Sequence, residues 1–345
     1  MLKFPKLIYA NKFSLTPLPP PGTFANHTIL ITGGTSGLGL ATAVHFLNLG
    51  ASKVIITGRT LAKGEAAKKS IEAQVQVKDA GEIEVRVLDM STFAGIKEFA
   101  DKVKEEMKSV DYVLLNAGLL ATAFRMGREG YEETIAVNCL GTALLAILLL
   151  PWVKTAGRGN GHLGVVTSGL HRGIDISPGK WPQKDFFTHF SKEENWPKGT
   201  PNMYAISKLL IQYCVNEISK LAVDKNGTVH AIVNPLCPGM VKTSLARDYR
   251  TSAIMGVAVD IFMTAVMKST EGGARRLVIP ALTTKEENGK YISDSQSHDE
   301  YLAAVQSNIL SPEGHKMQKQ VWEEVLSILE QKVPEVKEIV TSAAE

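Results

Sequence analysis

Two side chains spaced four residues apart, Tyr204 and Lys208, are of types that can carry acid–base chemistry. They fall in a stretch with helical periodicity, so the spacing places both on one face of a helix. A tyrosine hydroxyl has an ordinary pKa of about 10, and a neighbouring ammonium group favours the phenolate and lowers that pKa. The pair therefore indicates an assisted general acid, although an amphipathic surface helix would show the same spacing.

Two further polar residues stand at positions where chemistry is plausible. Ser168 follows the apolar run 163–167, and its hydroxyl could hold a carbonyl oxygen or simply end a strand in a turn. Asn138 interrupts the most apolar run of the chain, 135–150. A buried amide needs hydrogen-bond partners, so Asn138 is either a structural cap or part of a polar site.

A glycine-rich turn lies near the start of the chain, between a strand-like run and a helical one. The β-branched run 29–31 is followed by Gly33, Gly37 and Gly39, and a helical pattern then continues to Gly50. Glycines allow a tight turn, a close approach of backbone to a pyrophosphate, and close packing of helix on strand. The helix N-terminus offers free N–H groups to phosphates. The order predicts the dinucleotide-binding start of a doubly wound α/β fold, with a plain surface loop as the alternative.

Strand-like runs recur along the chain and alternate with helical stretches. These strands and helices would hold the candidate residues named above in place. The strand-like runs are 29–31, 53–57, 83–88, 112–116, 164–167, 228–234 and 291–293, and the main helical stretches are 61–77, 93–107, 131–150 and 204–222. Alternation of this kind implies a parallel sheet with helices on both faces. We therefore expect an α/β fold with a single Rossmann-type doubly wound sheet of about seven strands.

Residues 1–26 form a predicted N-terminal arm, and residues 27–345 form one domain. The arm should be solvated; contact with a membrane surface is the less favoured alternative. Two segments break the alternation: an insertion, 172–203, and an apolar segment, 242–268, predicted to be a substrate lid. Both follow strand ends, where ligands of open α/β sheets bind.

Composition excludes several classes of function. A net charge of +3 over 345 residues gives no case for nucleic acid as a partner. The three cysteines are widely spaced, which predicts no disulfide framework and no metal site, and favours a reducing, cytoplasmic setting. The apolar run 135–150 is shorter than the roughly 20 residues that span a bilayer, so a buried core helix is expected.

Taken together, seven short motifs make the chain resemble the short-chain dehydrogenase/reductase family, over about residues 27–295. In chain order they are Thr32-Gly33-x-x-x-Gly37-x-Gly39, Asp89, Asn116-Ala117-Gly118, Val137-Asn138-Cys139-Leu140-Gly141, Thr167-Ser168, Tyr204-x-x-x-Lys208 and Pro238-Gly239-x-x-x-Thr243. The segment 169–203 is longer than in many members. That length resembles the branch of retinol dehydrogenases, protochlorophyllide reductase and fungal secondary-metabolism reductases.

The resemblance implies hydride transfer between a nicotinamide dinucleotide and a small-molecule carbonyl or alcohol. Tyr204 would donate the proton, Lys208 would lower the pKa of Tyr204 and hold the nicotinamide ribose, Ser168 would hold the carbonyl oxygen, and Asn138 would anchor a water. The implied cofactor-binding residues are Gly33, Thr35, Ser36, Gly37, Leu38, Gly39, Arg59, Lys63, Asp89, Asn116, Ala117, Gly118, Tyr204, Lys208, Pro238, Gly239, Val241 and Thr243. Many relatives dimerise through two helices, which leaves a homodimer open.

NADP(H) is the predicted cofactor. Gly58 stands where an NAD enzyme usually carries a carboxylate that would repel a 2′-phosphate. Arg59 follows with a guanidinium suited to phosphate, and Lys63 adds charge one helical turn on. A solvated arginine in a loop is the alternative reading.

The substrate is expected to be bulky and largely apolar. Five aromatic residues lie in the insertion: Trp181, Phe186, Phe187, Phe190 and Trp196. They would enclose the substrate together with the apolar segment 253–267. Alternatively, the aromatics pack the insertion onto the domain, or 253–267 docks a membrane or a partner chain. Reduction of a C=C bond, retinol-type alcohol oxidation and a non-catalytic dinucleotide-binding scaffold are the rival functions.

Overall fold

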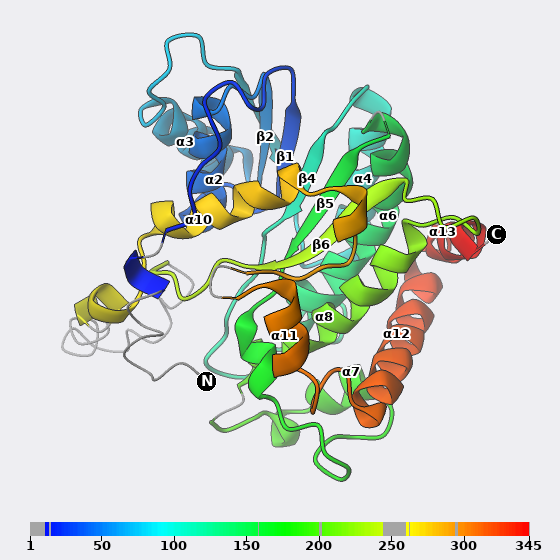
Figure 1. Ribbon diagram of the computed structural model, residues 1–345. Coiled ribbons are helices and arrows are strands. Elements are labelled where there is room, and N and C mark those ends of the chain that lie inside the picture. Colours follow the sequence, from blue (N-terminus) through cyan, green and yellow to red (C-terminus); the bar gives the residue numbers. More distant parts are fainter. Residues whose placement is uncertain are drawn as a thin grey trace.

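A seven-stranded parallel sheet forms the centre of the computed structural model, which describes residues 11–13, 15–157, 159–199, 202–243, 260–261, 263–293 and 296–344 (Figure 1). The strand order is β3-β2-β1-β4-β5-β6-β7. The strands are β1 (Thr28–Ile31), β2 (Lys53–Gly58), β3 (Glu82–Val87), β4 (Tyr112–Leu115), β5 (Gly161–Val166), β6 (Ala231–Cys237) and β7 (Ile292–Ser293). The predicted doubly wound sheet is confirmed, with the sixth strand beginning three residues later than expected.

Helices cover both faces of this sheet. The α-helices are α2 (Gly37–Asn48), α3 (Leu61–Glu72), α4 (Phe93–Glu106), α5 (Glu133–Ile135), α6 (Thr142–Ala156), α7 (Phe186–Phe190), α8 (Met203–Leu221), α10 (Thr270–Val278), α11 (His298–Ala304), α12 (Pro312–Lys332) and α13 (Glu335–Ala344). A π-helix, η1 (Ala136–Gly141), joins α5 to α6, and 3₁₀ turns occur at η2 (Gly169–Gly173), η3 (Glu193–Asn195), η5 (Ile279–Leu282) and η6 (Lys285–Glu287).

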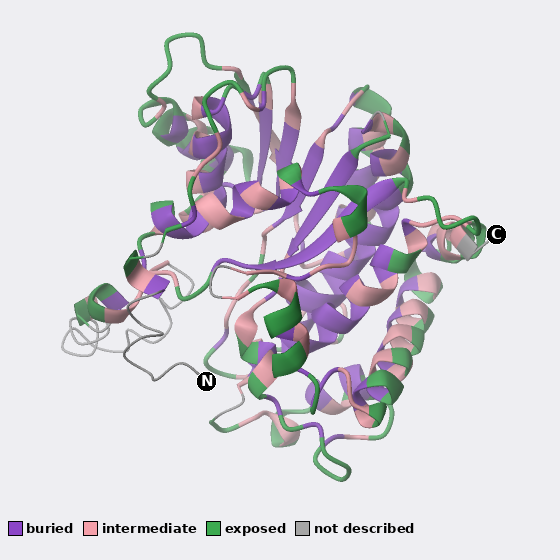
Figure 2. Ribbon diagram, in the orientation of Figure 1, coloured by how far each residue is buried: buried purple, intermediate pink, exposed green. Residues whose placement is uncertain are grey.

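The inner strands β1, β2 and β4 are apolar on both faces, which explains why they appear in the sequence as short apolar runs. In β1, Ile29 and Ile31 belong to the core shared with α2, α3 and α10, whereas Leu30 belongs to the larger core shared with α4, α6 and α8. Figure 2 shows this buried sheet between two helical layers whose outer faces are exposed. Successive side chains of the strand thus enter different cores. This alternation fixes the pairing register of the strand, because a slip by one residue would exchange its two faces.

The N-terminal arm packs against the domain along much of its described length. Phe24 is fully buried, and its ring lies 4.8 Å from that of Phe46 in an edge-on contact. Asn11 and Thr16 are buried as well. The expectation of a solvated arm is therefore wrong for these residues.

The insertion 172–203 is anchored by its aromatic residues and by α12. Four of its five aromatics are buried in the larger core: Trp181, Phe186, Phe187 and Phe190. The carboxylate of Glu324, on α12, accepts hydrogen bonds from the amides of Phe186 at 2.8 Å and Phe187 at 2.9 Å, which caps α7. The interpretation of these four rings as a substrate wall is wrong, because they pack the insertion onto the domain.

The helical stretch Glu133–Ala156 is long and apolar enough to cross a membrane by length and composition, yet 94% of its apolar window is buried inside the protein. It is a core helix, as expected. The helices α12 and α13 pack over α8 and α6 (Figure 1). Most of the predicted lid, 242–268, lies outside the described residues, which include only 242–243, 260–261 and 263–268 of it.

Candidate active site

Ser168 stands where β5 has ended and the turn η2 begins. Its backbone is extended, and its Oγ accepts a hydrogen bond from the amide of Leu170 at 3.3 Å, which caps the turn. The parallel neighbour β6 ends at Cys237, so both strands present their carboxyl ends at one edge of the sheet. This is the edge at which open α/β sheets bind ligands.

Tyr204 lies in the first turn of α8, whose N-terminus is capped by the side chain of Asn202. From there its hydroxyl lies close enough to that of Ser168 for Ser168 to influence its titration. Burial raises the pKa of Tyr204 above its ordinary value, and the nearby Cys237 thiol adds to this, while the Ser168 hydroxyl acts in the opposite direction. At neutral pH Tyr204 therefore carries its proton, as a general acid must.

Lys208 lies one helical turn beyond Tyr204 and is 4% exposed. Its Nζ donates to the carbonyl oxygen of Val166 at 2.7 Å and lies 5.6 Å from the centre of the Tyr204 ring. Burial lowers the pKa of Lys208 to about 8. The net pKa of Tyr204 is raised by burial, and Lys208 is not among the groups that shift it, so the lowering by Lys208 stays a prediction.

Asn138 lies in the π-helix η1, which interrupts the helical stretch expected over 131–150. Its Nδ2 donates to the carbonyl of Leu119 at 2.8 Å and to Oγ of Ser207 at 3.0 Å, and its Oδ1 accepts from the amide of Leu119 at 2.9 Å. Both amide protons are thus engaged, and only Oδ1 has capacity left to hold a water. A Cβ at Gly118 would lie 3.0 Å from this Oδ1 and 3.9 Å from Nζ of Lys208, so glycine keeps the space between them open.

The glycine-rich turn has two of the three properties predicted for it, the tight turn and the close packing of helix on strand. Gly33 has a φ of +67°, and a Cβ there would lie 2.9 Å from Cα of Ala117. A Cβ at Gly39 would lie 2.4 Å from the carbonyl oxygen of Gly33, so no side chain fits between helix and strand. Asn116 donates from Nδ2 to the carbonyl of Thr32 at 2.9 Å. The described contacts of the Asn116 side chain thus shape the turn itself.

The start of α2 is suited to an anion. Ser36, its N-cap residue, makes no side-chain capping hydrogen bond, and the first turn contains no acidic residue. The free N–H groups of this turn attract phosphate oxygens. Thr35 packs against Gly58 at the end of β2, where a Cβ would lie 2.6 Å from the Thr35 methyl group. Leu38 instead faces α10, beside Gly273.

Beyond β2 and β3, the charges of two arginines, Arg128 and Arg59, act on Asp89. Its Oδ1 accepts from the amide of Ser91 at 3.0 Å, and its Oδ2 lies 3.4 Å from Nη1 of Arg128. Partial burial raises the pKa of Asp89, but the bonds from Ser91 and the charges of Arg128 and Arg59 bring it below its ordinary value. Arg59 and Lys63 are exposed. Sequence reasoning missed Arg128, because nothing in its local pattern indicates that it reaches the end of β3.

The turn after β6 begins with a cysteine that sequence reasoning also missed. Sγ of Cys237 accepts hydrogen bonds from the amide of Gly169 at 3.2 Å and from that of Gly239 at 3.4 Å. It therefore joins the turn after Ser168 to the turn that carries Pro238.

The rest of this turn reaches the glycine-rich turn. Val241 packs against Gly273 of α10, and a Cβ at Gly37 would lie 3.8 Å from Cβ of Thr243. The predicted pyrophosphate and nicotinamide walls thus lie beside one another.

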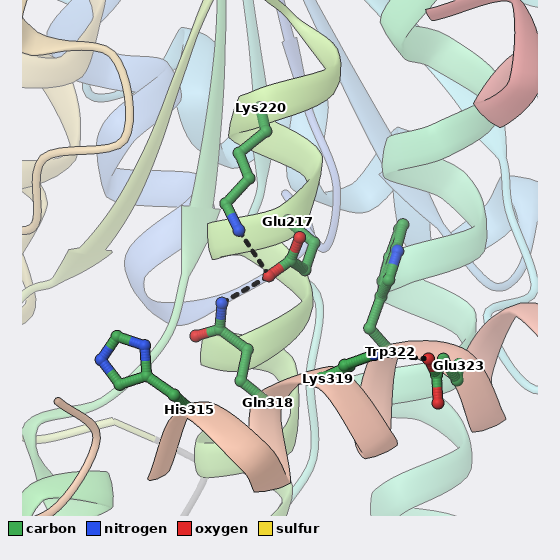
Figure 3. Close-up of a pocket in the computed structure, with 7 residues that line it drawn as sticks. All are labelled: Glu217, Lys220, His315, Gln318, Lys319, Trp322 and Glu323. Atoms are coloured by element: carbon green, nitrogen blue, oxygen red, sulfur yellow. Dashed lines mark hydrogen bonds and ion pairs between the residues drawn. The ribbon is translucent and has the colours of Figure 1, made fainter. Parts of the chain in front are cut away.

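A separate groove of about 380 Å³ lies between α8 and α12 (Figure 3). Most of the residues that line it are of polar or charged types: Glu217, Lys220, His315, Gln318, Lys319, Trp322 and Glu323. Glu217 binds Nζ of Lys220 at 2.7 Å and also accepts from Gln318. Glu217 is roughly 20 Å along α8 from Tyr204 at 1.5 Å per residue, so the groove is distinct from the site described above.

Comparison with known proteins identifies the family. Residues 27–171 match the family model of short chain dehydrogenases. A short-chain dehydrogenase/reductase of Aspergillus flavipes, ffsI, is 35% identical over 95% of this chain and 93% of its own length. The chain is a short-chain dehydrogenase/reductase. A second short-chain dehydrogenase/reductase, phmF of Phaeosphaeria nodorum, is 33% identical over 93% of this chain and 91% of its own length.

Solved structures of short-chain dehydrogenases share the fold at lower identity. Levodione reductase is 18% identical and superposes with a TM-score of 0.58 over 81% of this chain and 99% of that chain. A short chain dehydrogenase of Shigella flexneri, crystallised with NADP, is 19% identical, with a TM-score of 0.54 over 79% of this chain and 99% of that chain. As a short-chain dehydrogenase/reductase, the protein is an oxidoreductase of a family that binds a nicotinamide dinucleotide.

Proposed function

We propose that this short-chain dehydrogenase/reductase is an NADP(H)-dependent enzyme that reduces the carbonyl group of a bulky, largely apolar small molecule, or oxidises the matching alcohol. One observation carries the proposal: the hydroxyls of Ser168 and Tyr204 lie close together beyond the end of β5, with Lys208 one turn further along α8. Two converging hydroxyls can hold one carbonyl oxygen. The fungal relatives support a role in secondary metabolism. The proposed setting is the cytoplasm, in keeping with three free cysteines.

Each of the four candidate catalytic residues has its own role in this proposal. Ser168 donates a hydrogen bond to the carbonyl oxygen and orients it, and Tyr204 donates its proton as negative charge develops there. Tyr204 keeps its proton at neutral pH, which a proton donor in the reductive direction requires. Lys208 holds positive charge close to the phenol, and Asn138 can retain a water through Oδ1. The dinucleotide, when bound, supplies the hydride.

The residues around the glycine-rich turn and the end of β2 are suited to binding NADP(H). The tight glycine turn and the uncapped, acid-free start of α2 accept phosphates, and Gly58 leaves no carboxylate at the end of β2. Exposed Arg59 and Lys63 stand where a 2′-phosphate would need cations. The charge of Arg59 acts on Asp89, the residue that the resemblance assigns to the adenine, which supports this placement of the 2′-phosphate.

An apolar substrate is supported by exposed apolar side chains around the site. Leu170, two residues after Ser168, is 55% exposed, and Met240, next to Gly239, is 37% exposed. Ile261, in the predicted lid, is 65% exposed. Binding pockets for organic ligands combine such surfaces with a few polar groups, here Ser168 and Tyr204.

The test is consumption of NADPH and NADH with a panel of carbonyl compounds. We expect turnover with NADPH, and a higher kcat/KM on a polycyclic or terpenoid ketone than on a small polar carbonyl. Product analysis on an enone separates carbonyl reduction from C=C reduction. Dinucleotide binding without turnover on any substrate would favour the scaffold alternative, and a preference for NADH or for the small carbonyl would contradict the finer proposal.

A further inference from the structure

The N-terminal arm reaches the turn that follows β6, more than two hundred residues away in sequence. Nδ2 of Asn11 donates to the carbonyl oxygen of Met240 at 3.0 Å, and Oδ1 of Asn11 accepts from the amide of Met240 at 3.0 Å. Asn11 is 6% exposed. One side chain thus engages both backbone polar groups of Met240, as a neighbouring strand would.

The next residue of the arm binds a second element of the same region. Nζ of Lys12 donates to the carbonyls of Thr264 and Ala265, near the end of the helical stretch 263–266. Carbonyls in the last helical turn lack partners within the helix, and a cation there is favourable. In Figure 1 the blue segment 11–13 accordingly lies beside this stretch. Asn11 and Lys12 therefore connect the turn after β6 with the described end of the predicted lid.

The turn is also held from its other side. The carbonyl of Met240 accepts a second hydrogen bond from the amide of Lys268 at 3.0 Å, and the amide of Lys242 donates to the carbonyl of Lys268 at 3.0 Å. Gly239 lies between the two supports, since a Cβ there would lie 2.7 Å from Oδ1 of Asn11 and 3.1 Å from Nζ of Lys268. With a φ of +81°, this position has room only for glycine.

Because Asn11 is hydrogen-bonded to Met240, the position of the arm affects the position of the turn 239–243. Met240 lies three residues before Thr243, whose side chain packs against Gly37 of the glycine-rich turn. A shift of Met240 would change the separation of these two walls. We propose that Asn11 is a positioning residue of the dinucleotide site, and that the arm sets where residues 239–243 lie. The inference rests on the proposed function, because the turn matters in this way only if the chain binds a dinucleotide.

The experiment compares arm variants of the full chain by the Kd for NADPH, measured by fluorescence well below the melting temperature, and by hydrogen exchange at the amide of Met240. For Asn11→Ala we expect faster exchange at that amide and a Kd for NADPH roughly tenfold higher, from the loss of two hydrogen bonds. Asn11→Asp keeps an acceptor for the Met240 amide, and its Kd should lie between those of the parent and Asn11→Ala. Phe13→Ala is the matched control, because Phe13 is 61% exposed in the same arm and should leave the Kd within twofold.

The outcomes separate this inference from the proposed function. If Met240 exchanges faster in Asn11→Ala while the Kd for NADPH stays within twofold of the parent, the arm has only a structural role and the inference is overturned. If Asn11→Ala does not fold, Asn11→Asp decides, and a Kd equal to that of the parent overturns the inference. A parent chain that binds neither NADPH nor NADH would instead overturn the proposed function, and this inference with it.

Discussion

Nζ of Lys208 donates a 2.7 Å hydrogen bond to the carbonyl oxygen of Val166, two residues before Ser168 in the chain. The bond ties the helix that carries Tyr204 to the strand that delivers Ser168. It also places an ammonium group in a nearly water-free position, where the charged form is disfavoured. The proposed catalytic role and folding stability therefore make opposite demands on this lysine.

Lys208→Met should stabilise the fold at neutral pH and abolish turnover. The pKa of Lys208 falls from 10.5 to about 8 on folding. Its charge therefore costs stability below pH 8, and this cost disappears as the pH rises towards 10.5. One pKa unit corresponds to about 1.4 kcal/mol, so we expect a gain of about 2 kcal/mol at pH 7 after loss of the hydrogen bond.

Urea unfolding of parent and variant at pH 7 and pH 10 measures this gain, which should shrink at the higher pH. The control is Lys220→Met, whose side chain is 66% exposed at the other end of α8 and should show no such gain. A destabilised Lys208→Met at pH 7 would contradict the prediction.

Tyr204→Phe should lower kcat by roughly 10²- to 10⁴-fold, the usual contribution of a general acid. The ring keeps its packing, so the Kd for NADPH should stay near that of the parent. Stopped-flow or steady-state turnover with an accepted ketone provides the measurement. Tyr213→Phe is the matched control on α8, because its buried hydroxyl has no hydrogen-bond partner among the described residues. Near-normal kcat in Tyr204→Phe would rule out the assigned acid.

Arg59→Ala should weaken NADPH binding by about tenfold and leave NADH binding almost unchanged, since only NADPH carries the 2′-phosphate. Titration of both dinucleotides against both proteins tests this. Lys69→Ala, in the last turn of α3, removes a charge of the same sign and should alter neither affinity. Equal weakening of both dinucleotides would show that Arg59 acts on something other than the phosphate.

Cys237→Ala should lower kcat by about tenfold, because two partly buried hydrogen bonds, from the N–H groups of Gly169 and Gly239, would lose their acceptor. Cys237→Ser offers an oxygen acceptor and should restore part of the activity. Cys214→Ala removes a buried thiol away from the turns and should change the melting temperature more than kcat. If alanine and serine at position 237 behave alike, the sulfur is only a packing group.

The sheet and the placement of the candidate catalytic residues were predictable from the sequence because both depend on local patterns. The β-branched run at Ile29 marks a buried strand, and the spacing of Tyr204 and Lys208 fixes their common helix face. The role of Asn11 was not predictable, since its partner Met240 lies 229 positions away. The aromatic rings near Phe186 were misread because composition does not distinguish a ring that faces a substrate from one that faces a core.

Because Glu324 of α12 caps α7 of the insertion, the evolution of the insertion depends on that of the C-terminal segment. A descendant that lost α12 would leave the amides of Phe186 and Phe187 without acceptors, and one that lost the insertion would leave Glu324 half-buried without donors. The two segments should therefore be inherited together, and a chimera between relatives will need to exchange both at once.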